Sequence, residues 1–151
     1  MRVYTRSMQT PCYCAALRTA ARKATALYDV ALAPAGLTVA QFGLMRRIEH
    51  AGAVTVTELA GVAELDRSTA GRNVNALARR GLVRMVATDD RREAAAQLTA
   101  EGIAALERAA PLWAEAQARI ERALGDGAKQ LRALALGLRA EMRLGPPGGS
   151  S

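Results

Sequence analysis

The chain has 151 residues, of which half are hydrophobic and only 3% are aromatic, a length that fits one domain or one domain with appended helices. Its apolar residues are mainly Ala and Leu, which favour helices and argue against a β-sandwich, where β-branched and aromatic residues are more frequent. The net charge of +7 indicates either a polyanionic partner or a solvated basic surface.

The first predicted element is an amphipathic helix over residues 14–32, preceded by residues 1–11, which we expect to be a flexible extension. Its apolar residues recur at steps of three and four, as is typical of a helix with one buried face. They are Leu17, Ala20, Ala21, Ala24, Leu27, Tyr28 and Ala31. The segment Pro34-Ala35-Gly36 is expected to end this helix.

Two further helices are predicted from capping boxes, in which a Thr is followed three residues later by Gln or Glu. The first box, Thr38 to Gln41, begins a helix that stops at Ala51-Gly52. The second box, Thr55 to Glu58, begins a shorter helix that breaks at Leu65-Asp66.

The next predicted helix begins after Asp66, whose carboxylate can cap it, and stops at Gly81. At 100° per residue, its apolar side comprises Ala70, Val74 and Leu77. The opposite side comprises Ser68, Arg72, Asn75 and Arg79, flanked by Thr69 and Asn73. No acidic residue occurs between Arg67 and Arg84, whereas an ordinary surface helix carries acids and bases as ion pairs.

Positive charge is concentrated around this helix. Residues 66–92 contain seven Arg and three Asp, and so carry a local net charge of +4 out of the chain's +7. Arg suits bidentate contacts with guanine and phosphate, Asn pairs with adenine, and Ser or Thr contact either base edges or phosphates. The pattern indicates a helix that reads DNA, and the alternative is a solvated arginine-rich helix.

A β-hairpin is predicted directly after Gly81. Residues 82–86 are strand-like, residues 88–92 form a polar turn, and residues 94–98 return, although the alanines at 94–96 have poor strand propensity. A capped helix, a turn, a polar-faced helix and a hairpin together indicate a winged helix-turn-helix, whose second helix enters the major groove. Arg91 and Arg92 at the hairpin turn would reach the minor groove, with Asp89 or Asp90 pairing to one of them.

Two helices complete the predicted chain. Thr99 is expected to cap a long helix over residues 100–124 that is interrupted only by Pro111. After a turn at residues 125–127, the stripe of the last helix consists of Leu131, Leu134, Leu138 and Met142. Residues 145–151 (GPPGGSS) are expected to be a disordered tail.

Three segments of the sequence resemble the MarR family of bacterial regulators: LTVAQFGLM, LAGVAELDRSTAGRNVNALARRGLV and DDRREAAAQLTAEG. The resemblance spans residues 12–143. It is most specific in four successive parts: the polar-faced helix, GLV at residues 81–83, D-R-R at residues 90–92 and L-T-x-x-G at residues 98–102. It implies a cytoplasmic homodimer that binds a palindromic operator, acts as a repressor and is released by a small ligand or an oxidant. By position, it places DNA contacts on Ser68, Thr69, Arg72 and Asn73 of the helix and on Asp90, Arg91 and Arg92 of the wing. From the basic, acid-free character of the same helix we add Arg67, Asn75 and Arg79 as candidate DNA contacts.

We therefore expect a mainly α fold with a small β-hairpin wing, in which a winged helix-turn-helix lies between N- and C-terminal dimerisation helices. The expected segments are a flexible extension (1–11), a dimerisation helix (12–36), the DNA-binding domain (37–98), a long helix with a C-terminal dimerisation helix (99–144) and a tail (145–151). The first and last helices each have an apolar face that a two-fold partner would cover. Packing within one chain is the alternative.

Two cysteines are candidate sensors. Cys12 and Cys14 lie two residues apart at the start of the first helix, where helical geometry points their thiols about 160° apart, so they cannot bind one metal ion while helical. One reading makes Cys14 a small core residue and Cys12 incidental. The other is oxidation of the thiols or binding of a soft metal.

Four apolar side chains are candidates for a ligand pocket between the DNA-binding part and the dimerisation helices. They are Tyr28, Phe42, Met45 and Trp113, and ordinary core packing is the alternative for each. His50, the only histidine, ends the second helix, where a cation suits the helix dipole, and we interpret it as structural or solvent-exposed.

An enzyme is not expected, because the sequence has one His, no Cys/His ligand cluster, no G-x-G-x-x-G and no nucleophile elbow. We predict no metal and no cofactor. Residues 1–9 are polar and no apolar run approaches the length of a membrane span, so we expect a cytoplasmic protein with no membrane partner. The rival hypothesis is a helical protein-interaction module with a basic surface and no sequence-specific DNA binding.

Overall fold

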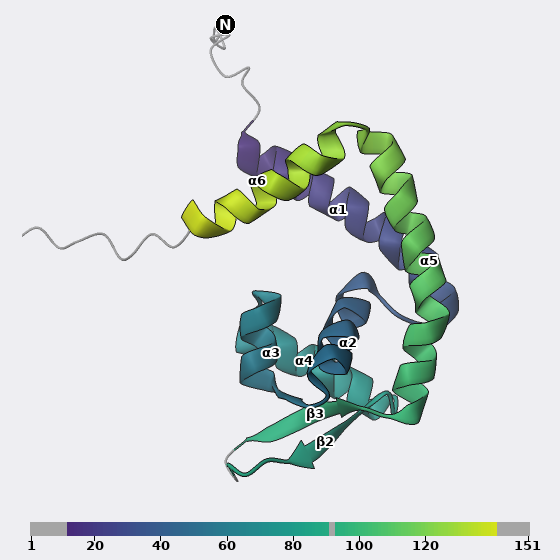
Figure 1. Ribbon diagram of the computed structural model, residues 1–151, viewed down its shortest axis with the longest axis vertical. Helices are drawn as coiled ribbons and strands as arrows, with labels where there is room; N and C mark the ends of the chain where they lie inside the picture. Colours follow the sequence, from purple (N-terminus) through teal and green to yellow (C-terminus); the bar gives the residue numbers. More distant parts are fainter. Residues whose placement is uncertain (1–11, 91–92, 142–151) are drawn as a thin grey trace, which may run out of the picture. The chain divides into compact units, whose positions relative to one another are not determined.

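The computed structural model describes residues 12–90 and 93–141 and shows a mainly helical chain with one small antiparallel sheet (Figure 1). It forms two compact units, one up to Ala116 and one from Gln117 onward. The predicted fold class is confirmed. The predictions for residues 1–11, Arg91, Arg92, Met142 and the 145–151 tail lie outside the described residues.

The first two helices lie where the sequence predicts, except that the first begins at Tyr13, one residue before the expected start. Helix α1 spans Tyr13–Leu32, a 3-10 turn (η1) spans Ala33–Ala35, and Gly36 takes the left-handed conformation with φ 70°. Helix α2 spans Val39–Ala51 and begins with the complete Thr38 capping box. The Oδ1 atom of Asp29 on α1 accepts a hydrogen bond of 2.7 Å from the backbone N–H of Val39, which links α1 to the first residue of α2.

Helices α3 and α4 form the helix-turn-helix. Helix α3 spans Val56–Ala63 after the Thr55 capping box, and α4 spans Arg67–Arg79 after the Asp66 cap. Helix α3 ends at Ala63, just before the expected break at Leu65-Asp66. Its C-cap, Glu64, takes the left-handed conformation with φ 54°, and the N–H of Glu64 donates to the carbonyl of Gly61.

The sheet has three strands in the order β1-β3-β2, all antiparallel. They are β1 (Val54–Thr55), β2 (Val83–Ala87) and β3 (Ala94–Leu98). The hairpin is confirmed, whereas β1 was not predicted, because two residues carry no readable alternation. The alanine-rich β3 is the central strand, and the small side chains of Ala95 and Ala96 are buried, so pairing on both edges outweighs poor propensity.

The core of the first unit lies between the helices and the inner face of the sheet (Figure 1). The largest fully buried side chains come from α1 through α4, and they are Leu32, Leu44, Met45, Ile48, Leu59, Val74 and Leu77. Because α3 and α4 both contribute to this cluster, their outer faces are held in a fixed orientation.

Helix α5 spans Ala100–Leu124, and its first turn is anchored to the start of β2. The Thr99 hydroxyl donates to the carbonyl of Gly81 (2.6 Å) and accepts from the N–H of Gly102 (3.0 Å), which confirms the predicted cap. A Cβ atom on Gly102 would lie 2.0 Å from the carbonyl oxygen of Leu82. The predicted interruption at Pro111 is wrong, because α5 remains one helix through that residue.

The second unit contains the end of α5 and helix α6, which spans Gly127–Glu141. The turn between them places Gly125 at φ 53°, and Arg132 of α6 forms an ion pair with Glu121 of α5. The apolar side chains of Leu131, Leu134 and Leu136 are exposed in the single chain.

Across residues 12–90 and 93–141, no single helix has the length and apolar character needed to cross a membrane. Helices α1 and α2 taken together have this length and apolar character, but the two are bent by 68° relative to each other.

Candidate nucleic-acid interface

Helix α4 has one buried and one exposed face, as its sequence predicts. Ala70, Val74 and Leu77 are completely buried. The exposed face comprises Ser68, Arg72, Asn75 and Arg79, with Thr69 and Asn73 half-buried at its edges. The core therefore holds α4 so that its hydroxyl, amide and guanidinium groups point to solvent.

The start of α4 is organised by the Asp66 carboxylate. Its Oδ1 accepts from the Ser68 hydroxyl (2.6 Å) and the Thr69 N–H (2.8 Å), and its Oδ2 accepts from the Thr69 hydroxyl (2.6 Å). These hydrogen bonds, led by that from Ser68, hold the pKa of Asp66 well below its usual range. Asp66 is therefore ionised at neutral pH, and it holds the two hydroxyls at the tip of the helix.

Two further side chains of this face are held by Thr69. The Arg72 guanidinium donates to the Thr69 hydroxyl (2.9 Å), and the Asn73 amide donates to the Thr69 carbonyl (3.0 Å) one turn earlier. Asp66, Thr69 and Arg72 thus form a continuous chain of hydrogen bonds along the exposed face. Asn73 is less free to reach a base than the sequence suggests, because part of its amide bonds its own helix.

Arg67, the first residue of α4, contacts both α3 and the wing. Its Nε donates to the Thr57 hydroxyl on α3 (3.1 Å), and its Nη2 lies 3.7 Å from the Glu93 carboxylate just before β3. Thr57 in turn donates both its hydroxyl (2.6 Å) and its N–H (3.3 Å) to Glu93. The hydrogen bond from the Thr57 hydroxyl is the main cause that lowers the pKa of Glu93. Sequence reasoning missed Thr57 and Glu93, which lie 36 residues apart.

The wing is held by polar contacts at its turn and between its strands. The Thr88 hydroxyl lies 2.6 Å from the carbonyl oxygens of both Asp90 and Glu93. Arg84 on β2 donates two hydrogen bonds to the Gln97 side chain directly opposite on β3 (3.0 and 2.7 Å). Asp90 is exposed, and its expected pairing with Arg91 or Arg92 lies outside the described residues.

Gly71 does not serve close packing between helices. A Cβ atom there would lie 3.9 Å from Val56 Cγ1, which is an ordinary contact. A shallow depression surrounds it, lined by Val56, Arg67, Ser68, Gly71, Arg72 and Asn75. The absence of a side chain at Gly71 therefore leaves open the surface beside Ser68 and Arg72.

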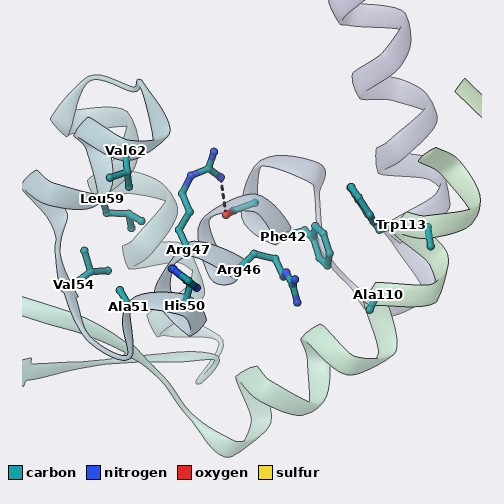
Figure 2. A pocket seen from close by; sticks show the side chains of 12 residues that line it. Phe42, Arg46, Arg47, His50, Ala51, Val54, Leu59, Val62, Ala110 and Trp113 are labelled. Atoms are coloured by element: carbon teal, nitrogen blue, oxygen red, sulfur yellow. Dashed lines mark hydrogen bonds between the residues drawn. The ribbon is translucent and has the colours of Figure 1, made fainter. Parts of the chain in front are cut away.

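A separate cavity of about 730 Å³ lies beside α2, between α3 and α5 (Figure 2). Phe42 and Trp113 stack at one end with ring centroids 5.9 Å apart, and Leu59 and Val62 line the other end. Of the four predicted pocket residues, only Phe42 and Trp113 line this cavity. Met45 is instead completely buried in the core, and Tyr28 is half-buried on α1 and does not line it.

The cavity has a basic side that the sequence did not reveal. Arg46, Arg47 and His50 line it from the last two turns of α2 (Figure 2). Arg46 pairs with Glu49 (3.1 Å), and Arg47 donates to the Gly43 carbonyl (2.8 Å). The sequence indicated Phe42 as a pocket residue, but which polar residues border the cavity depends on α5, which follows much later in the chain.

Both cysteines are exposed free thiols at the start of α1. The interpretation of Cys14 as a core residue is therefore wrong for the single chain, because the first turns of α1 extend beyond the core. Cys12 occupies the N-cap position without a side-chain hydrogen bond. Within the described parts of the chain, no group of three or more His, Cys, Asp or Glu side chains is placed to hold a metal ion.

Comparison with known proteins gives one consistent result. The MarR family model matches residues 35–93. An uncharacterized HTH-type transcriptional regulator of Bacillus subtilis, YhbI, is 33% identical over 116 residues, which are 76% of this chain and 75% of the relative.

Solved structures show the same likeness over most of the chain. The M. tuberculosis transcriptional regulator MosR, solved in complex with DNA, is 41% identical with a TM-score of 0.78, covering 88% of this chain and 99% of MosR. A variant of E. coli MarR complexed with operator DNA has a TM-score of 0.76 at 24% identity, covering 83% of this chain and 91% of that one, and so supports the fold alone.

Proposed function

Because this chain belongs to the MarR family of transcriptional regulators, we propose that it is a repressor that binds a palindromic operator as a homodimer through α4 and the wing. Membership makes the chain a DNA-binding transcriptional regulator of MarR type and not an enzyme. The operator, the dimer, repression and release by a ligand or oxidant are our proposals.

The observation that carries the proposal is the exposed face of α4. Its core-facing side is completely buried, so the helix cannot rotate to hide the outward side chains of Arg72, Asn75 and Arg79. Arg reads guanine and Asn reads adenine through paired hydrogen bonds in the major groove. We assign base or phosphate contacts to Arg67, Ser68, Thr69, Arg72, Asn73, Asn75 and Arg79, and wing contacts to Asp90, Arg91 and Arg92.

The homodimer is proposed from apolar side chains that the single chain leaves exposed. On α1, Tyr13 and Val30 are 79% and 75% exposed, and on α6 the side chains of Leu131, Leu134 and Leu136 are exposed as well. A second copy related by two-fold symmetry would cover such faces. It would also present two α4 helices to half-sites about 10 bp apart, which is why we expect a palindrome. A dimer that occupies both half-sites blocks other proteins from that stretch of DNA, which favours repression.

Release by a small ligand is proposed for the cavity beside α2. Stacked aromatic rings at one end and three basic side chains along α2 suit an apolar, anionic molecule. The cavity lies against α3, the first helix of the helix-turn-helix, so an occupant that displaces Leu59 or Val62 would move α3. Release by an oxidant is the alternative, through the exposed thiols of Cys12 and Cys14.

Selection of bound sequences from random duplex DNA tests the proposal. We expect enrichment of an inverted repeat, and an affinity for it that falls steeply with salt because phosphate contacts release counterions. The rival, a helical protein-interaction module, predicts no enriched sequence. Failure to enrich any repeat would overturn the proposed function.

A further inference from the structure

Three separate elements meet at the carboxylate of Glu93. The carboxylate precedes β3 of the wing, accepts both hydrogen bonds from Thr57 on α3, and lies 3.7 Å from the guanidinium of Arg67 on α4. Arg67 is also bound to the Thr57 hydroxyl through Nε. The Thr57 hydroxyl thus accepts one hydrogen bond from Arg67 and donates one to Glu93, so the three side chains are linked in one network.

This group lies at the edge of the surface that we assign to DNA. Arg67 is the first residue of α4, next to Ser68, and its side chain is 70% exposed. The Glu93 carboxylate is charged at neutral pH, as an ordinary glutamate is, and the hydrogen bond from Thr57 is the chief cause that lowers its pKa further. A cation at the tip of a recognition helix would ordinarily bind the nearest phosphate, whatever the sequence.

We propose that Glu93 is a positioning residue that acts through Arg67: it competes with DNA phosphates for this guanidinium and thereby limits sequence-independent binding. This inference rests on the proposed function. An exposed ion pair is weak enough for a DNA phosphate to replace the carboxylate, since such a pair shifts the equilibrium between its formed and broken states by only about two- to fivefold. Glu93 therefore sets the background affinity against which the operator is recognised, while base contacts farther along α4 set the preference for sequence.

The test is a double-mutant cycle between Glu93→Gln and Arg67→Gln, measured on duplex DNA that lacks the enriched operator. Gln retains an oxygen that accepts from Thr57 but removes the charge, so the wing stays attached. We expect Glu93→Gln to raise affinity about two- to fivefold and to steepen the dependence of log K on log salt by up to about 0.9, the value for one added phosphate contact. In the Arg67→Gln background, Glu93→Gln should have no effect.

Glu101→Gln is the control, because Glu101 is an exposed carboxylate in the first turn of α5 to which we assign no role in DNA binding. It removes the same charge, so a general electrostatic effect on DNA would appear in both variants. Equal gains from Glu101→Gln and Glu93→Gln would overturn the inference, as would a gain that persists without Arg67 or an unchanged salt slope. If the wild type binds its operator and Glu93→Gln has wild-type affinity for both the operator and the duplex that lacks it, only this inference fails. If the wild type binds no operator, the proposed function fails as well.

Discussion

Gly102 lies against the backbone of Leu82, so closely that a Cβ atom would stand 2.0 Å from the Leu82 carbonyl oxygen and 3.0 Å from its carbonyl carbon. That same carbonyl oxygen accepts from the N–H of Thr99 (3.1 Å). We expect Gly102→Ala to lower the free energy of unfolding by about 1–3 kcal/mol, because the clash is with backbone that cannot rotate away. Urea denaturation followed by circular dichroism measures the change.

The control for this substitution is Gly61→Ala on α3, where nothing lies within 4 Å of an added Cβ. There we expect a gain of up to about 1 kcal/mol from helix propensity. If both substitutions have the same effect, the close approach at Leu82 does not limit residue 102.

Arg72→Ala tests the assigned face of α4. We expect a loss of about 1–3 kcal/mol in operator binding together with a relaxed preference at one base pair, because Arg72 points outward and is held by Thr69. Fluorescence anisotropy with the selected operator and single-base variants measures both. Arg108→Ala on α5, also exposed, should leave binding unchanged; wild-type affinity of Arg72→Ala would refute the assignment.

The Asp66 carboxylate makes stability depend on pH. Hydrogen bonds from Ser68 and Thr69 lower its pKa in the folded state, so its contribution is present above the unfolded-state pKa of about 4 and is lost as pH falls. Asp66→Asn retains an oxygen for the cap but loses the charge. The wild type should therefore be more stable than Asp66→Asn at pH 7, and urea midpoints should converge towards about pH 2. A constant difference across this range would contradict the prediction.

Trp113 is the only tryptophan in the chain, so its fluorescence reports on the cavity directly. We expect benzoate, an apolar anion, to change Trp113 emission in a saturable manner, and benzamide, its neutral counterpart, to bind less well. Replacing Arg46 and Arg47 by Gln should weaken benzoate binding about two- to fivefold, whereas Arg22→Gln on α1 should not. Equal binding of benzoate and benzamide would exclude the basic side of the cavity from recognition.

The thiols of Cys12 and Cys14 provide the test of oxidative release. Peroxide oxidises two thiols to a disulfide and is itself reduced to two water molecules, and the exposed thiols of Cys12, the N-cap, and Cys14, in the first turn of α1, are open to this reaction. We expect peroxide to lower operator affinity of the wild type, reversibly with dithiothreitol, and not that of the Cys12→Ser/Cys14→Ser variant. Equal responses to peroxide, and to arsenite in a parallel titration, would remove the thiols from the mechanism.

Much of the DNA-binding unit is readable from short-range sequence patterns. The capping boxes at Thr38 and Thr55 and the cap at Asp66 are complete within four residues, so their helix starts could be predicted to the residue. The exposed and buried faces of α4 follow from the helical period alone. The MarR resemblance supplied the order of elements and their expected roles.

The remaining features depend on contacts between distant residues. Thr57 and Glu93 are 36 positions apart, and each by itself is an ordinary polar surface residue. The basic side of the cavity needs α2 and α5 to meet, and β1 exists only because Val54 pairs with Ala96. None of these pairings leaves a period or a motif, because only the tertiary structure brings the partners together.

If Ser68 contacts DNA as we propose, the cap at the start of α4 also determines what kind of base edge this serine can recognise. An ionised carboxylate only accepts hydrogen bonds, so Ser68 must give its single proton to Asp66. Its oxygen is then left with lone pairs alone, which match the exocyclic amino groups of adenine and cytosine and repel guanine O6 and thymine O4. In the proposed complex, the carboxylate of Asp66 would thus make the hydroxyl of Ser68 a hydrogen-bond acceptor, and not a donor, towards the bases.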